Sequence, residues 1–461
     1  MKDLKLIIYL LASLILLGVT ACEEDETAPV RVNFSNTETG ISDEASSADI
    51  EISFSRPAES DGNLSVQIKS ASLAYGEDAD FFTSPAASDM IATVPFAIGD
   101  ESVTVTISAG SALNIDQDES ITLTISNDTG VLDLGDQVTF TVVFSENFVV
   151  PSAEIKTDVG GDDRTHQVYI DLSSGQTTRV DRNDFDLVLE SAGDGFNILL
   201  NATAVMNAKK TDQIDFTKVS EDDTVGLDLS GLIDRAEEGT TFTGDFAETV
   251  FYEWDKESTT SHVYIIDRGI DKYGGQDRGW KKVQITKSGT SYTVRSADLD
   301  GTNETSFSIN KSSNQNFKYV HFGNGEATVA PEDGQWDLVL STLSQVAFYG
   351  GQYYGTYNSQ AAFHNFYGGT LVAVINTDEV EITYEDLTKE AAISALSETE
   401  DDYSIIGTNW RGLDANYQIV INSNLIYCFQ DIDGNLFKFQ FTAYYNGDSE
   451  VGPSFKYEHL K

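Results

Sequence analysis

A segment rich in tyrosine and glycine, residues 348–369, is the first place where the types and spacing of the side chains could bind a ligand. It reads FYGGQYYGTY, continues to FHNFYGG, and contains Tyr353, Tyr354 and His364. Tyrosine rings offer flat apolar walls with one polar atom, and glycines leave the backbone adaptable. The segment therefore suits a planar ligand or a sugar ring stacked on aromatics. The alternative is a long glycine-rich β-hairpin whose tyrosines cover one face of a sheet.

The sequence lacks the short motifs of common catalytic sites. It contains no Gly-x-Ser-x-Gly, no His-Glu-x-x-His, no glycine-rich phosphate loop that opens a helix, and no cysteine–histidine dyad. Carboxylates are abundant, but abundance does not pair an acid with a base. We therefore expect a binding protein, not an enzyme.

Residues 1–22 predict export and a lipid anchor. A basic start leads into an apolar run, residues 6–19, which falls short of the roughly 20 residues that cross a bilayer. The ending Val19-Thr20-Ala21-Cys22 resembles the lipobox of bacterial lipoproteins, which implies acylation of Cys22 after removal of residues 1–21. An ordinary secreted protein that is cut near Ala21 is the alternative.

Residues 22–29 read as an acidic tether. The run Glu23-Glu24-Asp25-Glu26 resembles the export tag that sends lipoproteins of Bacteroidetes to the outer face of the outer membrane. A plain solvated tether would have the same composition. We expect an outer-membrane protein that is held by lipid and faces the exterior of the cell.

Composition limits the possible partners. The chain has 461 residues and a net charge of -47, with 28 Lys and Arg against 75 Asp and Glu. Nucleic acid needs clustered basic residues, so it is excluded as a partner. Once Cys22 is acylated only Cys428 remains, which rules out an intramolecular disulfide. Cys428 lies in an apolar strand, where we expect a buried, inert thiol.

Residues 30–147 predict an antiparallel β-sandwich. Short segments there alternate apolar with polar residues, which buries one face of each strand. These segments are Val30–Phe34, Ile50–Phe54, Leu64–Ile68, Val103–Ile107, Ile121–Ile125 and Val138–Phe144. A linker is expected near residues 149–152, followed by a second β-rich region, residues 148–461.

Details of the first region resemble a Calx-beta or related immunoglobulin-like module. The resemblance rests on residues 75–81, the turn at 96–100, and the acidic turn before residues 121–127. It implies calcium binding by acidic loops at one end, with Asp116, Asp118 and Glu119 as candidate oxygen ligands. In so acidic a chain, ordinary turn residues are the alternative.

The second region contains two similar stretches. Residues 166–176 lead to residues 185–191, and residues 317–326 lead to residues 336–342. Each has an aromatic strand, a turn with glycine, and the sequence aromatic-Asp-Leu-Val-Leu. We predict two related hairpin units in one sheet system, and one short helix, Tyr384–Leu396.

The same region resembles the HmuY-like lipoproteins of Bacteroidetes over about the last 300 residues. The resemblance is carried by residues 317–322, Gly325-Glu326, Trp336-Asp337-Leu338, the hairpin at 426–441, Tyr444-Tyr445 and residues 452–457. It implies an all-β protein displayed on the outer membrane for iron acquisition. It also implies that the protein captures haem and passes it to a TonB-dependent outer-membrane receptor.

Haem iron needs axial donors, usually a histidine nitrogen or a methionine sulfur. His364 and Met206 follow corresponding strands of the two similar stretches, so they could face one cleft with Tyr353 and Tyr354. Met206 could equally be core filler, and His321 could be a half-buried sheet residue. The other histidines, His166, His262 and His459, read as structural or exposed. The alternative to haem capture is a surface glycan-binding or adhesive lipoprotein with no haem affinity.

Overall fold

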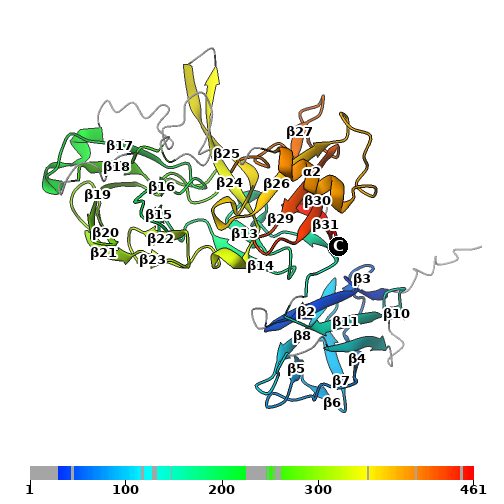
Figure 1. Ribbon diagram of the computed structural model, residues 1–461. Helices are drawn as coiled ribbons and strands as arrows, with labels where there is room; N and C mark the ends of the chain where they lie inside the picture. The colour runs from blue at the N-terminus through cyan, green and yellow to red at the C-terminus, as the bar shows by residue number, and fades with distance from the viewer. Residues whose placement is uncertain are drawn as a thin grey trace, which may run out of the picture. The chain divides into compact units, whose positions relative to one another are not determined.

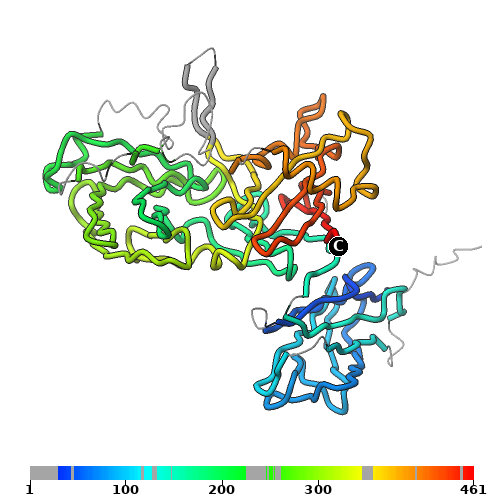
Figure 2. The backbone as a smooth tube through the Cα atoms, in the orientation of Figure 1, coloured from blue at the N-terminus to red at the C-terminus, as the bar shows by residue number. Residues whose placement is uncertain are grey.

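The chain divides into two compact units, Met1–Asn147 and Phe148–Lys461. The computed structural model describes residues 30–42, 46–115, 119–126, 132–146, 148–224, 246, 249–252, 254, 261–349, 352–399, 402–446 and 450–461, and it describes residues 345–349 and 352–356 by their backbone alone. Strands dominate both units, which confirms the all-β fold class (Figures 1 and 2).

The first unit is a sandwich of two sheets. One sheet has the order β10-β1-β3-β8-β5 and the other β2-β11-β9-β4-β7-β6. The strands of the first are β1 (Arg31–Phe34), β3 (Ser47–Phe54), β5 (Phe81–Ser84), β8 (Ser102–Ala109) and β10 (Asp133–Leu134). Those of the second are β2 (Glu38–Ile41), β4 (Gly62–Ser70), β6 (Ala87–Ser88), β7 (Ile91–Phe96), β9 (Glu119–Ser126) and β11 (Thr139–Phe144).

Alternation of apolar and polar residues builds this sandwich. Along β3, Ile50 and Ile52 are buried while Asp49 and Glu51 are exposed, because successive side chains of a strand point to opposite faces. The buried residues of both sheets form one hydrophobic core. Every strand predicted from the alternation in this region is present.

The second unit contains two five-stranded sheets at its ends (Figure 1). The order β12-β31-β30-β29-β26 joins β12 (Ser152–Lys156), β26 (Leu371–Asn376), β29 (Leu425–Gln430), β30 (Leu436–Asn446) and β31 (Glu450–His459). The order β17-β18-β19-β20-β21 joins β17 (Asn207–Lys210), β18 (Val263–Asp267), β19 (Trp280–Ser288), β20 (Ser291–Ala297) and β21 (Thr305–Asn310).

Short elements complete the second unit. A hairpin is formed by β27 (Arg411–Leu413) and β28 (Ile419–Ile421). The 3-10 turns are η1 (Gly161–Asp163), η2 (Phe216–Lys218), η3 (Glu221–Thr224), η5 (Asp333–Gln335) and η6 (Phe366–Gly368).

Two four-stranded sheets lie in the middle of the second unit. One has the order β14-β13-β24-β25 and the other β16-β15-β22-β23. The first joins β13 (His166–Ile170), β14 (Thr177–Asp181), β24 (Leu338–Tyr349) and β25 (Gln352–His364). The second joins β15 (Leu187–Glu190), β16 (Ile198–Leu200), β22 (Phe317–His321) and β23 (Gly325–Ala327).

These middle sheets correct the prediction of two related hairpin units in one sheet system. The first strand of each similar stretch pairs with the second strand of the other: Tyr169 of β13 lies opposite Val339 of β24, and Tyr319 of β22 lies opposite Val188 of β15. Corresponding strands therefore take corresponding places in the two sheets. The two stretches form one interlocked structure, and neither forms its central strand pair alone.

The helix α2 (Lys389–Glu398) begins later than the sequence pattern predicted. The Thr388 side chain accepts a hydrogen bond from the Ala391 backbone nitrogen, which fixes the start of the helix. Thr383 and Asp386 instead hydrogen-bond to each other in a preceding turn. Among the described residues, no helix has the length and apolar character needed to span a membrane.

Candidate functional site

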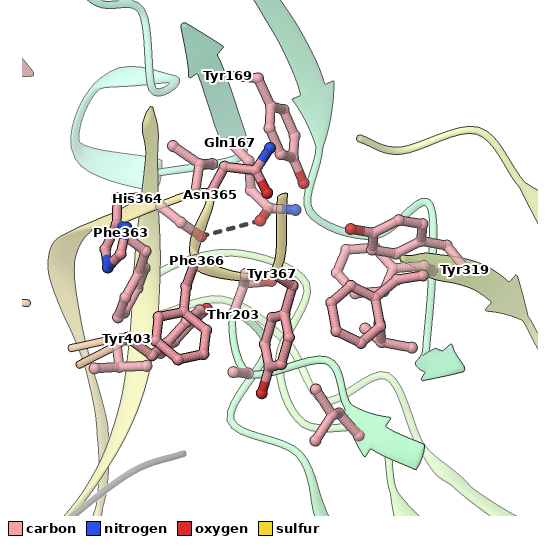
Figure 3. Close-up of a pocket in the computed structure, with 18 of the residues that line it drawn as sticks. Gln167, Tyr169, Thr203, Tyr319, Phe363, His364, Asn365, Phe366, Tyr367 and Tyr403 are labelled. Carbon is pink, nitrogen blue, oxygen red and sulfur yellow. Dashed lines mark hydrogen bonds between the residues drawn. The ribbon is translucent and has the colours of Figure 1, made fainter. Parts of the chain in front are cut away.

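The two middle sheets border a pocket with a volume of about 130 Å³. Its lining comes from β13, β15, β16, β22, β24 and β25 and from the segments that directly follow β16 and β25 (Figure 3). Phe185 just before β15, Trp336 just before β24, and Tyr403 after α2 complete it. The exchange of strands between the two stretches therefore creates the pocket, because each sheet contributes a wall that includes residues of both stretches.

Aromatic rings at corresponding positions form much of the lining. Tyr169 packs edge-on against Trp336 with ring centroids 5.1 Å apart, and Tyr319 packs in the same way against Phe185 at 5.2 Å. Tyr169 and Tyr319 are also hydrogen-bonded to each other through their side chains. The pocket thus lies where the two stretches meet.

A second aromatic group comes from the end of β25 and the segments packed on it. Phe363 stacks on Tyr403 with centroids 4.9 Å apart, and Tyr367 meets Phe317 edge-on at 5.0 Å. Figure 3 shows Tyr319 on one side of the pocket and Phe363 and Tyr403 on the opposite side. Apolar ring faces of this kind favour a ligand that is itself a ring.

Two buried asparagines hold the segments that line the pocket. The partners of Asn201 are the carbonyl oxygens of Arg182 (2.7 Å) and Phe185 (2.9 Å) and the amide nitrogen of Thr203 (2.9 Å). The partners of Asn365 are the carbonyl oxygens of Asp333 (2.7 Å) and Trp336 (3.0 Å) and the amide nitrogen of Gly368 (3.0 Å). Asparagine thus holds the backbone at corresponding positions, directly after β16 and directly after β25.

Two aspartates of the repeated aromatic-Asp-Leu-Val-Leu sequence also correspond. Asp186 accepts a hydrogen bond from the Phe322 backbone nitrogen, and Asp337 accepts one from the Leu172 backbone nitrogen, both at 2.8 Å. Each carboxylate therefore ties its own stretch to the other. The repeated sequence predicts related units but gives these aspartates and the two asparagines no role, although their repetition is a usable signal.

His364 lines the pocket, but both of its ring nitrogens are engaged. Nδ1 lies 2.9 Å from the Thr370 hydroxyl, and Nε2 lies 3.1 Å from the Asp402 carbonyl oxygen. His364 is 1% exposed, and its ring meets the rings of Phe366 and Phe429 edge-on. In this arrangement neither nitrogen is available to a metal.

Met206 does not join His364. Its side chain is buried in a separate hydrophobic core with Ala208 and Ile266, outside the pocket lining. His321 is also absent from the lining; its Nδ1 accepts a hydrogen bond from Gly323, and burial lowers its pKa. The structure therefore does not bring the predicted nitrogen and sulfur donors together.

Several predicted residues lie outside the described part of the chain. These are Cys22, Asp116 and Asp118, together with the side chains of Tyr353 and Tyr354. Glu119 is described and begins β9. Within the described residues, no group of three or more His, Cys, Asp or Glu side chains could hold a metal ion. Cys428 is buried, and burial raises its pKa to about 12, as an inert thiol requires.

The pH dependence of thermal stability should report the raised pKa of Asp337. Burial, and then the negative charge of Asp171, raise the pKa of Asp337 well above its usual value. A carboxyl group whose pKa is raised in the folded state contributes stability at low pH and loses it as the pH rises through that pKa. We expect Asp337→Asn to melt above the wild type at pH 7.5, with the difference shrinking towards pH 4 in thermal scans. A difference that does not change with pH would contradict this assignment.

Comparison with solved structures gives only distant similarity. The apo-form Calx CBD1 domain is 12% identical, covers 26% of this chain and 97% of its own, and has a TM-score of 0.22. A two-domain protein of unknown function from Bacteroides fragilis is 10% identical, covers 41% of this chain and 73% of its own, and has a TM-score of 0.20. Similarity at this level establishes nothing about function. No curated protein matches the chain.

A family model gives the decisive match. The model described as HmuY protein matches residues 163–457, a range that includes both similar stretches and every residue of the pocket lining. The match covers more than half of the 461 residues. This chain belongs to the HmuY family.

Proposed function

We propose that this protein is a lipid-anchored protein of the outer membrane that faces the cell exterior and captures haem, or a related tetrapyrrole, for uptake through a TonB-dependent receptor. Family membership over residues 163–457 carries this proposal. Acylation of Cys22 would supply the anchor, since one or two lipid chains hold a protein at a membrane without a spanning helix. We propose binding and transfer without catalysis.

The residues that line the described pocket do not fit haem. His364 is the only lining residue with a nitrogen of the kind that ligates haem iron, and both of its ring nitrogens are engaged. The volume of about 130 Å³ is also below the roughly 300 Å³ at which pockets for drug-sized ligands begin. Tyr353 and Tyr354, which were predicted from the sequence, stay as the proposed haem contacts, because tyrosine can also ligate haem iron.

A haemin titration of the full-length chain tests this proposal. We expect a Soret band that saturates at one equivalent and that survives in His364→Ala, because the His364 nitrogens are already engaged. In Tyr353→Phe/Tyr354→Phe the band should shift or be lost, since phenylalanine removes the oxygen and keeps the ring. Absorbance in the oxidised and reduced forms gives the readout.

The matched control is Tyr417→Phe, because Tyr417 is 83% exposed and does not line the pocket. It should leave the haemin spectrum unchanged. If the wild-type protein gives no saturable Soret band, the proposal of haem capture is wrong. If His364→Ala alone abolishes the band, the assignment of the ligand to the tyrosines is wrong.

A further inference from the structure

We infer that the aromatic pocket between the two middle sheets is a second binding site, which takes a small neutral ring with hydrogen-bond acceptors on its edge. The site is separate from the proposed haem capture and does not depend on it. A neutral sugar ring and an uncharged nucleobase share this chemistry, and the experiment below distinguishes them.

Two hydrogen-bond donors in the lining have no partner. The Gln167 side chain is 6% exposed; its Oε1 accepts a hydrogen bond from the Ser341 hydroxyl at 3.1 Å, while its Nε2 is unpaired. The indole Nε1 of Trp336 is also buried and unpaired. Leaving a buried donor unsatisfied costs about 1–3 kcal/mol, so a ligand that brings acceptors would remove this cost.

The lining is uncharged although the chain carries a net charge of -47. None of the described residues that line the pocket is Asp, Glu, Lys or Arg. Burial raises the pKa of Tyr319 to about 12, so its hydroxyl stays protonated. A charged ligand would lose its hydration here without gaining an ion pair, which is strongly unfavourable. The pocket therefore selects neutral ligands.

Size and shape limit the ligand to a single small ring. The volume of about 130 Å³ leaves no room for a macrocycle. Edge-on and stacked aromatic pairs surround the space, among them Tyr169 with Trp336 and Phe363 with Tyr403. Rings in these positions can contact the faces of a sugar or a base, while Gln167 and Trp336 donate to its edge.

Binding of matched probes to the full-length chain tests this inference. The probes are methyl β-glucoside, its acidic counterpart methyl β-glucuronide, and uracil, followed by ligand-observed NMR and calorimetry. We expect methyl β-glucoside or uracil to bind, and the one that binds identifies the source of the ring. The glucuronide should bind at least tenfold more weakly than the glucoside if the sugar is the ligand.

Two conservative variants test the roles of the donors. Gln167→Glu keeps the shape and an acceptor for Ser341 but replaces the free NH₂ by oxygen, so we expect at least a tenfold loss of affinity for the neutral probe. Trp336→Phe keeps an aromatic ring but removes the N–H, so its affinity for the neutral probe should fall several-fold. Tyr417→Ser, on an exposed turn, should leave the affinity for the neutral probe unchanged.

The inference is overturned if neither neutral probe binds, if the glucuronide binds as well as the glucoside, or if both pocket variants bind as the wild type does. Circular dichroism of each variant checks that it is folded. The haemin titration is a separate measurement, so a protein that binds haemin and no neutral probe would support haem capture and refute the second site.

Discussion

Asp186→Asn is expected to lower the free energy of unfolding of the C-terminal unit by about 3–5 kcal/mol, because it removes the charge that balances two arginines in a buried network. The Asp186 carboxylate is fully buried and lies 2.9 Å from Arg268 Nε and 2.8 Å from Arg278 Nη2. Asparagine has one acceptor oxygen instead of two, so its NH₂ group would face either a guanidinium or the Phe322 backbone N–H, and one of these donors would lose its acceptor.

Urea unfolding followed by tryptophan fluorescence measures this effect. All four tryptophans, Trp254, Trp280, Trp336 and Trp410, belong to the C-terminal unit, so the signal reports on that unit. The matched control is Glu304→Gln, which breaks a solvent-exposed pair with Arg295 and should cost less than about 1 kcal/mol. Equal effects of the two substitutions would show that the Asp186 network does not stabilise the fold.

Asn201→Ala and Asn365→Ala are each expected to lower the free energy of unfolding by about 3 kcal/mol or more. Each removes three hydrogen bonds to backbone groups, which are buried around Asn201 and buried or part-buried around Asn365, and an unsatisfied buried group costs about 1–3 kcal/mol. The two side chains are 0% and 3% exposed. Because they hold corresponding segments, their effects should be similar in size.

The same unfolding assay applies, with Asn416→Ala on the exposed turn of the β27–β28 hairpin as the control, expected within about 0.5 kcal/mol of the wild type. Binding of the neutral probe adds a second readout, since both asparagines position residues of the pocket lining. If one variant is destabilised and the other is unaffected, the correspondence between the two stretches is only a similarity of sequence.

Local pattern was sufficient to predict much of the fold. The alternation along segments such as Ile50–Phe54 predicted strands that the structure contains, because burial of one face of a sheet leaves a period of two residues in the sequence. Resemblance over about the last 300 residues, above all in the hairpin at 426–441, likewise pointed to the family that the family model identifies.

Local pattern could not predict which strands pair. The repeated aromatic-Asp-Leu-Val-Leu sequences indicated two related units, but β13 could pair with either β15 or β24 as far as its own residues show. Pairing across about 170 residues, such as Val168 with Leu340, depends on contacts between segments that are distant in the chain. The prediction of two hairpins failed for this reason.

The candidate site likewise separates what the sequence pattern predicts from what the fold decides. The sequence by itself determined an all-β chain, its two similar stretches, and the presence of His364 beside a segment rich in aromatics. Only the tertiary structure decided that the His364 nitrogens are engaged by Thr370 and Asp402, and that Met206 is buried in another core. It also decided that Gln167 and Trp336, each with an unpaired buried donor, line one pocket. The physical reason is that the period of a strand fixes which face a side chain occupies, whereas its hydrogen-bond partners come from segments that the fold brings beside it.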